Sequence, residues 1–152
     1  MDMPDIEVLR RRAIRIIAAT RFPFVDQDDW PDDYTTITNE SETGCGIESP
    51  WGMVYPSIVV VNGENRVREV GEVETEVTKA QVAKWRLLSK RTGMGRRTKK
   101  FFLYVPEGKE AEAERLLEEN QISYAGLRTW AVKHGNLVVT PIKTPDDPKD
   151  HK

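Results

Sequence analysis

The run from Trp51 to Val77 restricts the possible folds of this chain more than any other part of its sequence. Met53 to Val61 is apolar and rich in β-branched residues, which is typical of a buried strand. Asn62 to Asn65 contains an Asn-Gly pair, which accepts the positive φ of a hairpin turn. From Arg66 to Thr75 polar and apolar residues alternate, as they do in a half-buried strand. The sequence therefore predicts a β-hairpin.

Two glutamates of the second strand, Glu72 and Glu74, occupy alternate positions and therefore share one face. Like charges at such spacing repel, by about 1 kcal/mol at 4 Å in water and about 4 kcal/mol at an intermediate effective dielectric. One interpretation is a solvated outer strand face, where this repulsion costs little. The other is a divalent-cation site, because Mg²⁺ prefers a few carboxylates together with water. The spacing alone favours the solvated face and leaves the cation site open.

Helices and strands alternate after the hairpin. Thr78 and Gln81 have the spacing of a capping box, which begins a helix of about Lys79 to Lys90 with a broad apolar surface. The apolar run Phe101 to Val105 predicts a buried strand, and a helix of about Lys109 to Asn120 follows. This order indicates an α/β fold with a mixed sheet.

Further elements are expected on both sides of this region. A helix that opens at Pro4 and Asp5 precedes it, and its apolar stripe is predicted to contain Ile6, Leu9, Ala13, Ile16, Ile17 and Thr20. The arginines of this helix are predicted to form a solvated face; they are Arg10, Arg11, Arg12 and Arg15. Short strands are expected at 34–38, within 122–130 and at 137–139, the last of them at a sheet edge.

The two hairpin strands carry a resemblance to a known family. Tyr55-Pro56-Ser57-Ile58-Val59-Val60 and Val70-Gly71-Glu72-Val73-Glu74, followed by the helix and the Phe101–Val105 strand, resemble the core of the PD-(D/E)XK nuclease superfamily. The resemblance covers about Tyr55 to Trp130. It implies the restriction-endonuclease-like fold, a three-layer α/β core whose mixed central sheet is flanked by helices.

The resemblance also implies site residues. In the family, an acid after the proline and the first acid of the second strand bind Mg²⁺, and a third residue, usually lysine, positions or activates the attacking water. Ser57 stands at the first acid, Glu72 at the second and Glu74 at the lysine position. Some members tolerate glutamate for lysine, but a serine hydroxyl is a weak, neutral ligand for a hard cation. Either another acid supplies the missing ligand, or the catalytic metal site is lost.

Two functions follow as expectations. The first is a divergent metal-dependent nuclease, a hydrolase that cleaves phosphodiesters with Mg²⁺ or Mn²⁺ at Glu72 and Glu74. The second is a non-catalytic module on the same fold that binds nucleic acid or protein.

Basic residues follow one another between Lys84 and Lys100 without an acid among them. One interpretation is a grip on the phosphates of DNA or RNA, for which the candidates are Arg91, Arg96, Arg97, Lys99 and Lys100. The other is a solvated helix end, because the helix dipole favours cations there. The sequence leaves both open.

Length and composition limit the number of domains and the cellular setting that can be expected. At 152 residues the chain is expected to form one domain over 1–143, followed by a disordered polar tail over 144–152. No apolar run approaches the roughly 20 residues that span a bilayer, and the acidic start lacks a signal-peptide pattern, so no membrane partner is expected. Cys45 is the only cysteine, which excludes an intrachain disulfide and suits a cytoplasmic setting.

Overall fold

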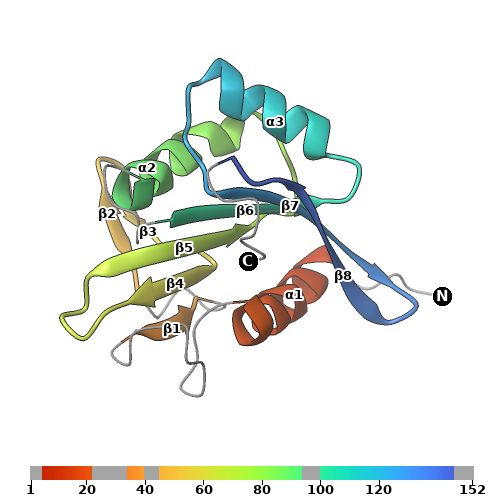
Figure 1. Cartoon of the computed structure of the whole chain (residues 1–152), viewed down its shortest axis with the longest axis horizontal. Helices are drawn as coiled ribbons and strands as arrows, with labels where there is room; N and C mark the ends of the chain where they lie inside the picture. The colour runs from red at the N-terminus through yellow and green to blue at the C-terminus, as the bar shows by residue number, and fades with distance from the viewer. Residues whose placement is uncertain (1–4, 22–33, 40–44, 94–99, 146–152) are drawn as a thin grey trace.

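The protein has a mixed α/β architecture in which helices cover both faces of a six-stranded sheet (Figure 1). The structure is a computed structural model that describes residues 5–21, 34–39, 45–93 and 100–145. The helices are α1 (Ile6–Arg21), α2 (Val82–Gly93) and α3 (Glu110–Glu119), with a 3₁₀ turn η1 (Lys79–Gln81) directly before α2. The strands are β1 (Thr35–Thr38), β2 (Ile47–Ser49), β3 (Gly52–Val54), β4 (Ile58–Val61), β5 (Val67–Val73), β6 (Lys100–Pro106), β7 (Gly126–Lys133) and β8 (Asn136–Lys143).

The main sheet has the order β1-β4-β5-β6-β7-β8, and β2 pairs with β3 in a separate hairpin. The β4–β5 pair is antiparallel, as the sequence predicted, and β5, β6 and β7 run parallel. Parallel neighbours need a crossover connection, and the two segments that contain α2 and α3 supply it. The expected α/β class, with a mixed sheet flanked by helices, is therefore confirmed.

The first hairpin strand differs from the expectation. Met53 to Val61 was expected to be one strand, but β3 ends at Val54 and β4 begins at Ile58. Pro56 lies in the interruption, and a proline cannot donate a ladder hydrogen bond. Ser57 consequently stands just before β4 rather than within a strand.

Two apolar layers hold the helices to the sheet. Alternate strand residues such as Val70, Leu103 and Leu127 belong to the layer shared with α2 and α3. Residues of the other face, such as Phe102 and Trp130, belong to the layer shared with α1. Figure 1 shows α1 on one side of the sheet and α2 with α3 on the other.

The apolar stripe of α1 is rotated from the predicted one. Ile6 is 47% exposed and Thr20 is exposed, whereas Ile14 and Ala18 are buried. The prediction was wrong at these positions but correct at Ala13 and Ile17, which are both buried. The buried face also includes Ile14 and Ala18, so it is turned toward them relative to the predicted stripe. Arg10 precedes Ile14 by four residues and therefore lies on the buried face rather than on a solvated one.

No helix in the described ranges is both long enough and apolar enough to span a bilayer. The cytoplasmic location remains a prediction. Residues 146–152, where the disordered tail was expected, lie outside the described part of the chain.

Candidate functional site: a buried acid pair

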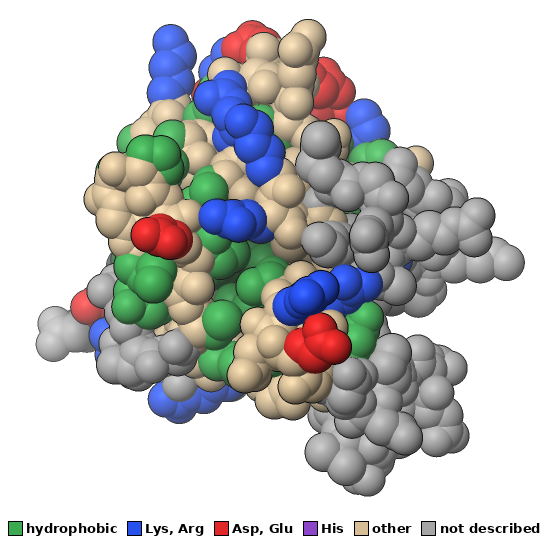
Figure 2. Space-filling view, turned by 90° about the vertical axis from the view of Figure 1, so that its left-hand side faces the viewer, with side chains coloured by type: hydrophobic (Ala, Val, Ile, Leu, Met, Phe, Trp, Pro, Cys, Tyr) green, Lys and Arg blue, Asp and Glu red, His purple; other side chains and the backbone are tan. Residues whose placement is uncertain are grey.

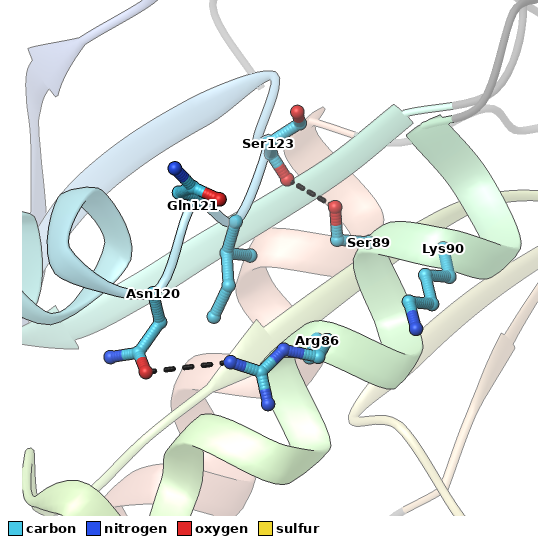
Figure 3. Close-up of a pocket in the computed structure, with 7 residues that line it drawn as sticks. Arg86, Ser89, Lys90, Asn120, Gln121 and Ser123 are labelled. Atoms are coloured by element: carbon cyan, nitrogen blue, oxygen red, sulfur yellow. Dashed lines mark hydrogen bonds between the residues drawn. The ribbon is translucent and has the colours of Figure 1, made fainter.

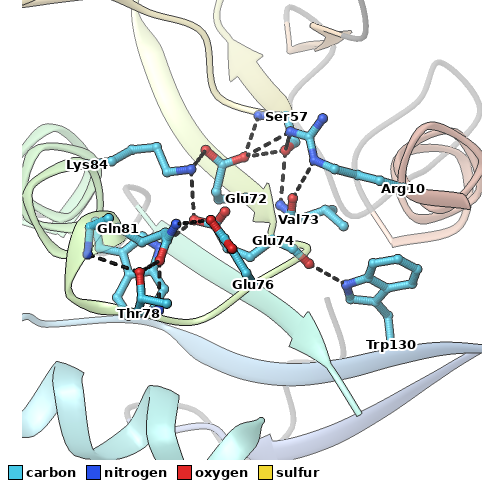
Figure 4. Close-up of polar contacts among 12 residues, drawn as sticks. Arg10, Ser57, Glu72, Val73, Glu74, Glu76, Thr78, Gln81, Lys84 and Trp130 are labelled. Atoms are coloured by element: carbon cyan, nitrogen blue, oxygen red, sulfur yellow. Dashed lines mark hydrogen bonds and ion pairs between the residues drawn. The ribbon is translucent and has the colours of Figure 1, made fainter. Parts of the chain in front are cut away.

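The glutamate pair lies at the end of β5, and both side chains are buried. Glu72 is 1% exposed and Glu74 is 6% exposed, so the interpretation as a solvated outer face is wrong. Both carboxylates approach the same ammonium group: Lys84 Nζ is 2.8 Å from Glu74 Oε2 and 3.4 Å from Glu72 Oε2 (Figure 4). Glu72 and Glu74 therefore share one cation, the side chain of Lys84.

Helix α2 places Lys84 at the pair. The predicted capping box is present: the Thr78 hydroxyl accepts from the Ala80 N–H, while the Gln81 side chain accepts from the Thr78 N–H. This fixes the start of the helical segment so that Lys84 and Trp85 lie against β5. The buried indole N–H of Trp85 donates to Glu74 Oε2 at 2.7 Å. Two consecutive residues of α2 therefore bind the same carboxylate oxygen.

Ser57 binds Glu72 from the position just before β4. Its backbone N–H donates to Glu72 Oε1 at 3.1 Å, and its hydroxyl donates to the same oxygen. The Ser57 hydroxyl also accepts from the Val73 N–H and from Arg10 Nη2, both at 3.0 Å. A hydroxyl has one proton to donate and two lone pairs, so all of its hydrogen-bonding capacity is used.

Arg10 reaches this site from α1. Its Nε donates to the Val73 carbonyl at 2.7 Å, and its Nη2 lies 3.7 Å from Glu72 Oε1. Its Nη1 lies 3.5 Å from Glu7 Oε2, and the Glu7 side chain is 48% exposed. The guanidinium thus stands between Glu7 and the acid pair, and Glu7 does not supply a third carboxylate to it.

The charges of the site balance, since two carboxylates face an ammonium and a guanidinium. Burial raises the pKa of Glu74, and the neighbouring Glu72 charge raises it further, against smaller lowering effects of Lys84 and Trp85. Burial lowers the pKa of Lys84, but the two carboxylates outweigh burial and leave this pKa above its ordinary value. Lys84 is therefore a firmly charged partner, whereas Glu74 is the carboxylate that takes up a proton more readily than usual.

The described residues do not form a complete divalent-cation site. Ser57 is saturated, and both oxygens of Glu72 are engaged by Ser57, Arg10 and Lys84. In the described part of the chain, no group of three or more His, Cys, Asp or Glu side chains is placed to hold a metal ion. The position between the carboxylates, where a metal ion would lie, holds the Lys84 ammonium instead.

The two basic candidates that the structure describes, Arg91 and Lys100, do not lie at the acid pair. Arg91 lies two turns beyond Lys84 on α2, about 10 Å along the helix, and its Nη2 donates to the Glu48 carbonyl at 3.4 Å. Lys100 begins β6 opposite Glu69, roughly 10 Å along the strand from Glu72. The other three candidates, Arg96, Arg97 and Lys99, lie outside the described residues.

Sequence reasoning missed two residues of this cluster, Arg10 and Lys84. Lys84 was grouped with the basic segment, although it stands one helical turn after the capping box and directly before a tryptophan. That position could have indicated that Lys84 faces the strand that carries Glu72 and Glu74.

Comparison of the chain with models of protein families, with curated proteins and with solved structures finds no match. Membership of the PD-(D/E)XK superfamily therefore stays a prediction.

Proposed function

We propose that this protein is a nucleic-acid-binding domain on a restriction-endonuclease-like fold and that it does not itself hydrolyse phosphodiesters. The observation that carries the absence of hydrolysis is the position of the Lys84 ammonium, 2.8 Å from Glu74 and 3.4 Å from Glu72. An acid pair that is already neutralised has no need of a metal ion to offset its repulsion.

The order of the elements supports the fold assignment. The acids end the second strand of an antiparallel hairpin, α2 follows, and β6 returns parallel to β5. This is the arrangement that the family resemblance implies for the segment from Tyr55 onwards.

The bonding of Glu72 supports the absence of hydrolysis. A divalent ion that entered between the carboxylates would have to expel Lys84, and the like charge of Arg10 would remain 3.7 Å from Glu72 Oε1. Removing a partner from a buried charge costs several kcal/mol, roughly 3–5 when a buried pair is broken. The cluster is therefore best explained as a structural centre that ties α1 and α2 to the hairpin.

Exposed side chains on another face support nucleic acid as the ligand. Figure 2 shows hydrophobic side chains gathered beside lysine and arginine side chains on the face that carries the β2–β3 hairpin. Trp51 is 59% exposed and Met53 is 57% exposed. The Arg91 bond to Glu48 holds the basic end of α2 next to this hairpin. An exposed aromatic ring beside cations is suited to a single strand, whose bases stack while its phosphates are neutralised.

Fluorescence anisotropy with a labelled single-stranded oligonucleotide tests the proposal. We expect binding that weakens as salt rises and that falls by about fivefold or more in Trp51→Ala, since one stacked base contributes about 1–3 kcal/mol. Arg91→Gln should weaken binding and lower its salt dependence. Lys133→Gln is the matched control, because Lys133 is also exposed but lies at the β7–β8 turn, on the other side of the molecule (Figure 1). The proposal is contradicted if the affinity for the oligonucleotide does not change with salt, or if Trp51→Ala binds it as tightly as the wild type does.

Metal-dependent hydrolysis is the second candidate, and one observation favours it. The family uses two acids and a lysine, and here Lys84 brings an ammonium to Glu72 and Glu74 from the following helix. Cleavage of plasmid and oligonucleotide with Mg²⁺ or Mn²⁺, lost in Glu72→Gln, would establish this function in place of the first.

A further inference from the structure

A second polar site lies on the outer side of α2, away from the acid pair. A cavity of about 390 Å³ opens between α2 and the connection from α3 to β7 (Figure 3). This volume is in the range of small-molecule sites, about 300–1,000 Å³. No carboxylate is among the described residues that line it. We propose that this cavity binds a phosphomonoester group.

Two cations of α2 provide the charge. Arg86 and Lys90 are four residues apart, so their side chains leave the same helix face about 6 Å from each other, and both line the cavity. The side-chain contact of Arg86 is with neutral Asn120 Oδ1 at 3.4 Å, and Lys90 makes no side-chain hydrogen bond or ion pair within the described ranges. A phosphomonoester carries a charge of about −1.5 to −2 at pH 7, which two such cations balance.

Nearby acids of α3 do not compete for these cations. Glu119 is paired with Arg115 at 2.9 Å, and Glu118 lies 3.4 Å from Lys143. Each acid is thus engaged by a cation of α3 or β8. The charge of Arg86 and Lys90 consequently stays available to a ligand.

The backbone at the end of α3 supports a binding role for Gln121. Gln121 donates to the Glu118 carbonyl and Ile122 to the Leu117 carbonyl, which together close a Schellman turn after the C-cap residue Asn120. Glycine is favoured at the position that Gln121 occupies, because its φ is +53°. A glutamine here accepts backbone strain, and its side chain is one of those that line the cavity (Figure 3).

The remaining lining defines the class of ligand. Gln121 and Ser123 offer side-chain donors without other partners among the described residues. The Ser89 hydroxyl is already bonded to the Ser123 carbonyl at 2.5 Å and braces the connection against α2. Ile122 is 6% exposed and gives the cavity an apolar floor. The site therefore suits a phosphoryl group attached to a small organic part, such as a nucleoside monophosphate or the phosphorylated end of a nucleic-acid strand.

The strand-end ligand rests on the proposed function, whereas the free nucleotide does not. Titration calorimetry at constant ionic strength distinguishes them, with AMP, adenosine, inorganic phosphate, and a 5′-phosphorylated and a 5′-hydroxyl oligonucleotide as probes. We expect AMP and phosphate to bind and adenosine not to bind. A preference for the 5′-phosphorylated strand over the 5′-hydroxyl strand identifies the strand end, while equal affinity assigns the site to the free nucleotide.

Charge variants test the site itself. Arg86→Gln and Lys90→Gln should each weaken AMP binding by about tenfold, because each removes a charge-assisted contact. Arg66→Gln and Lys133→Gln are the matched controls and should leave AMP binding unchanged, since Arg66 lies beside Glu64 and Lys133 beside Glu107, both away from the cavity.

Gln121→Gly should raise the melting temperature and still weaken AMP binding, a combination that a purely structural glutamine would not give. AMP affinity that is equal in all five variants and the wild type overturns the proposal, even if oligonucleotides bind elsewhere. Loss of oligonucleotide binding with AMP binding retained overturns the proposed function instead.

Discussion

Ser57 donates both its backbone N–H and its hydroxyl to a single oxygen of Glu72, with 3.1 Å between the backbone nitrogen and Oε1. The residue that replaces an expected acid is thus a donor to the acid beside it. A serine here stabilises the charge of Glu72, whereas a carboxylate would repel it. Ser57 and the two cations near it, Arg10 and Lys84, belong to the same balance of charge.

Ser57→Ala should lower the free energy of unfolding by about 2–3 kcal/mol, because the Val73 N–H and the Arg10 guanidinium lose an acceptor inside the protein. Ser89→Ala is the matched control. Ser89 is also buried but gives one hydrogen bond, so its loss should cost about 1 kcal/mol. Urea unfolding of both variants measures the difference, and equal costs would contradict the triple role assigned to the Ser57 hydroxyl.

Lys84→Met should create affinity for Mn²⁺ that the wild type lacks. The variant leaves Glu72 and Glu74 without their shared cation, and a divalent ion then offsets their repulsion. We expect a flat Mn²⁺ titration by calorimetry for the wild type, binding for Lys84→Met, and loss of that binding in Lys84→Met/Glu72→Gln. Lys133→Met removes an exposed ion pair with Glu107 and serves as the control. Mn²⁺ binding by the wild type would favour the nuclease instead.

Ser57→Asp should be destabilised in the absence of metal and stabilised by Mn²⁺. The added carboxylate lies beside Glu72, so three carboxylates would face the two cations Arg10 and Lys84. One buried negative charge is then uncompensated, and the variant should be less stable than the wild type by several kcal/mol, roughly 3–5. Mn²⁺ should raise its melting temperature and leave that of the wild type unchanged. A Ser57→Asp variant that is as stable as the wild type in the absence of metal would contradict the balanced charge inferred for the cluster.

The pH dependence of stability should change in Glu74→Gln. Burial and the Glu72 charge raise the pKa of Glu74 in the folded state, so the folded protein holds this proton more tightly than the unfolded chain. As pH rises from the ordinary value of 4.5 through the raised value, the wild type therefore loses stability, at most about 1.4 kcal/mol per pH unit. Glu74→Gln lacks this loss, and its stability relative to the wild type should increase with pH across that window. Urea unfolding between pH 4 and about 8 measures the difference, and a decrease would show the opposite shift. Lys84 does not disturb the comparison, because its raised pKa matters only above about pH 10.

Gln121→Gly should raise the free energy of unfolding by about 1 kcal/mol, because a non-glycine residue in the left-handed region costs about 1–2 kcal/mol. Gly108→Ala is the inverse control. Gly108 has φ +95° and nothing lies within 4 Å of an added Cβ, so alanine there adds strain without a clash and should destabilise. Thermal unfolding checks both, and a destabilised Gln121→Gly would mean that the glutamine side chain itself holds the turn.

The sequence predicted the elements better than it predicted the site. The alternation of Arg66 to Thr75, the capping box of Thr78 and the apolar run at Phe101 are local signals, and each corresponds to an observed element. The sharing of one face by Glu72 and Glu74 was also predicted correctly. Their burial was not, because it depends on what covers the strand end, and the sequence of a strand does not contain that information.

Arg10 and Lys84 show why the rest of the site was missed. Each residue sits in a run of similar cations, so composition gives no reason to single it out. A rotation of α1 by a fraction of a turn, from Ala13 toward Ile14, decides whether Arg10 faces solvent or Glu72. That rotation is set by packing against the sheet, which becomes visible only in three dimensions.

The contact of Arg10 with the Val73 carbonyl joins residues 63 positions apart, whereas Ser57 and Glu72 are 15 apart. Glu74 and Trp85 are closer still, 11 apart. Closing short loops costs less entropy than closing long ones, so the hairpin and α2 can assemble while α1 is still undocked. Arg10, the cation more distant in sequence, then completes the neutralisation of Glu72 when α1 docks.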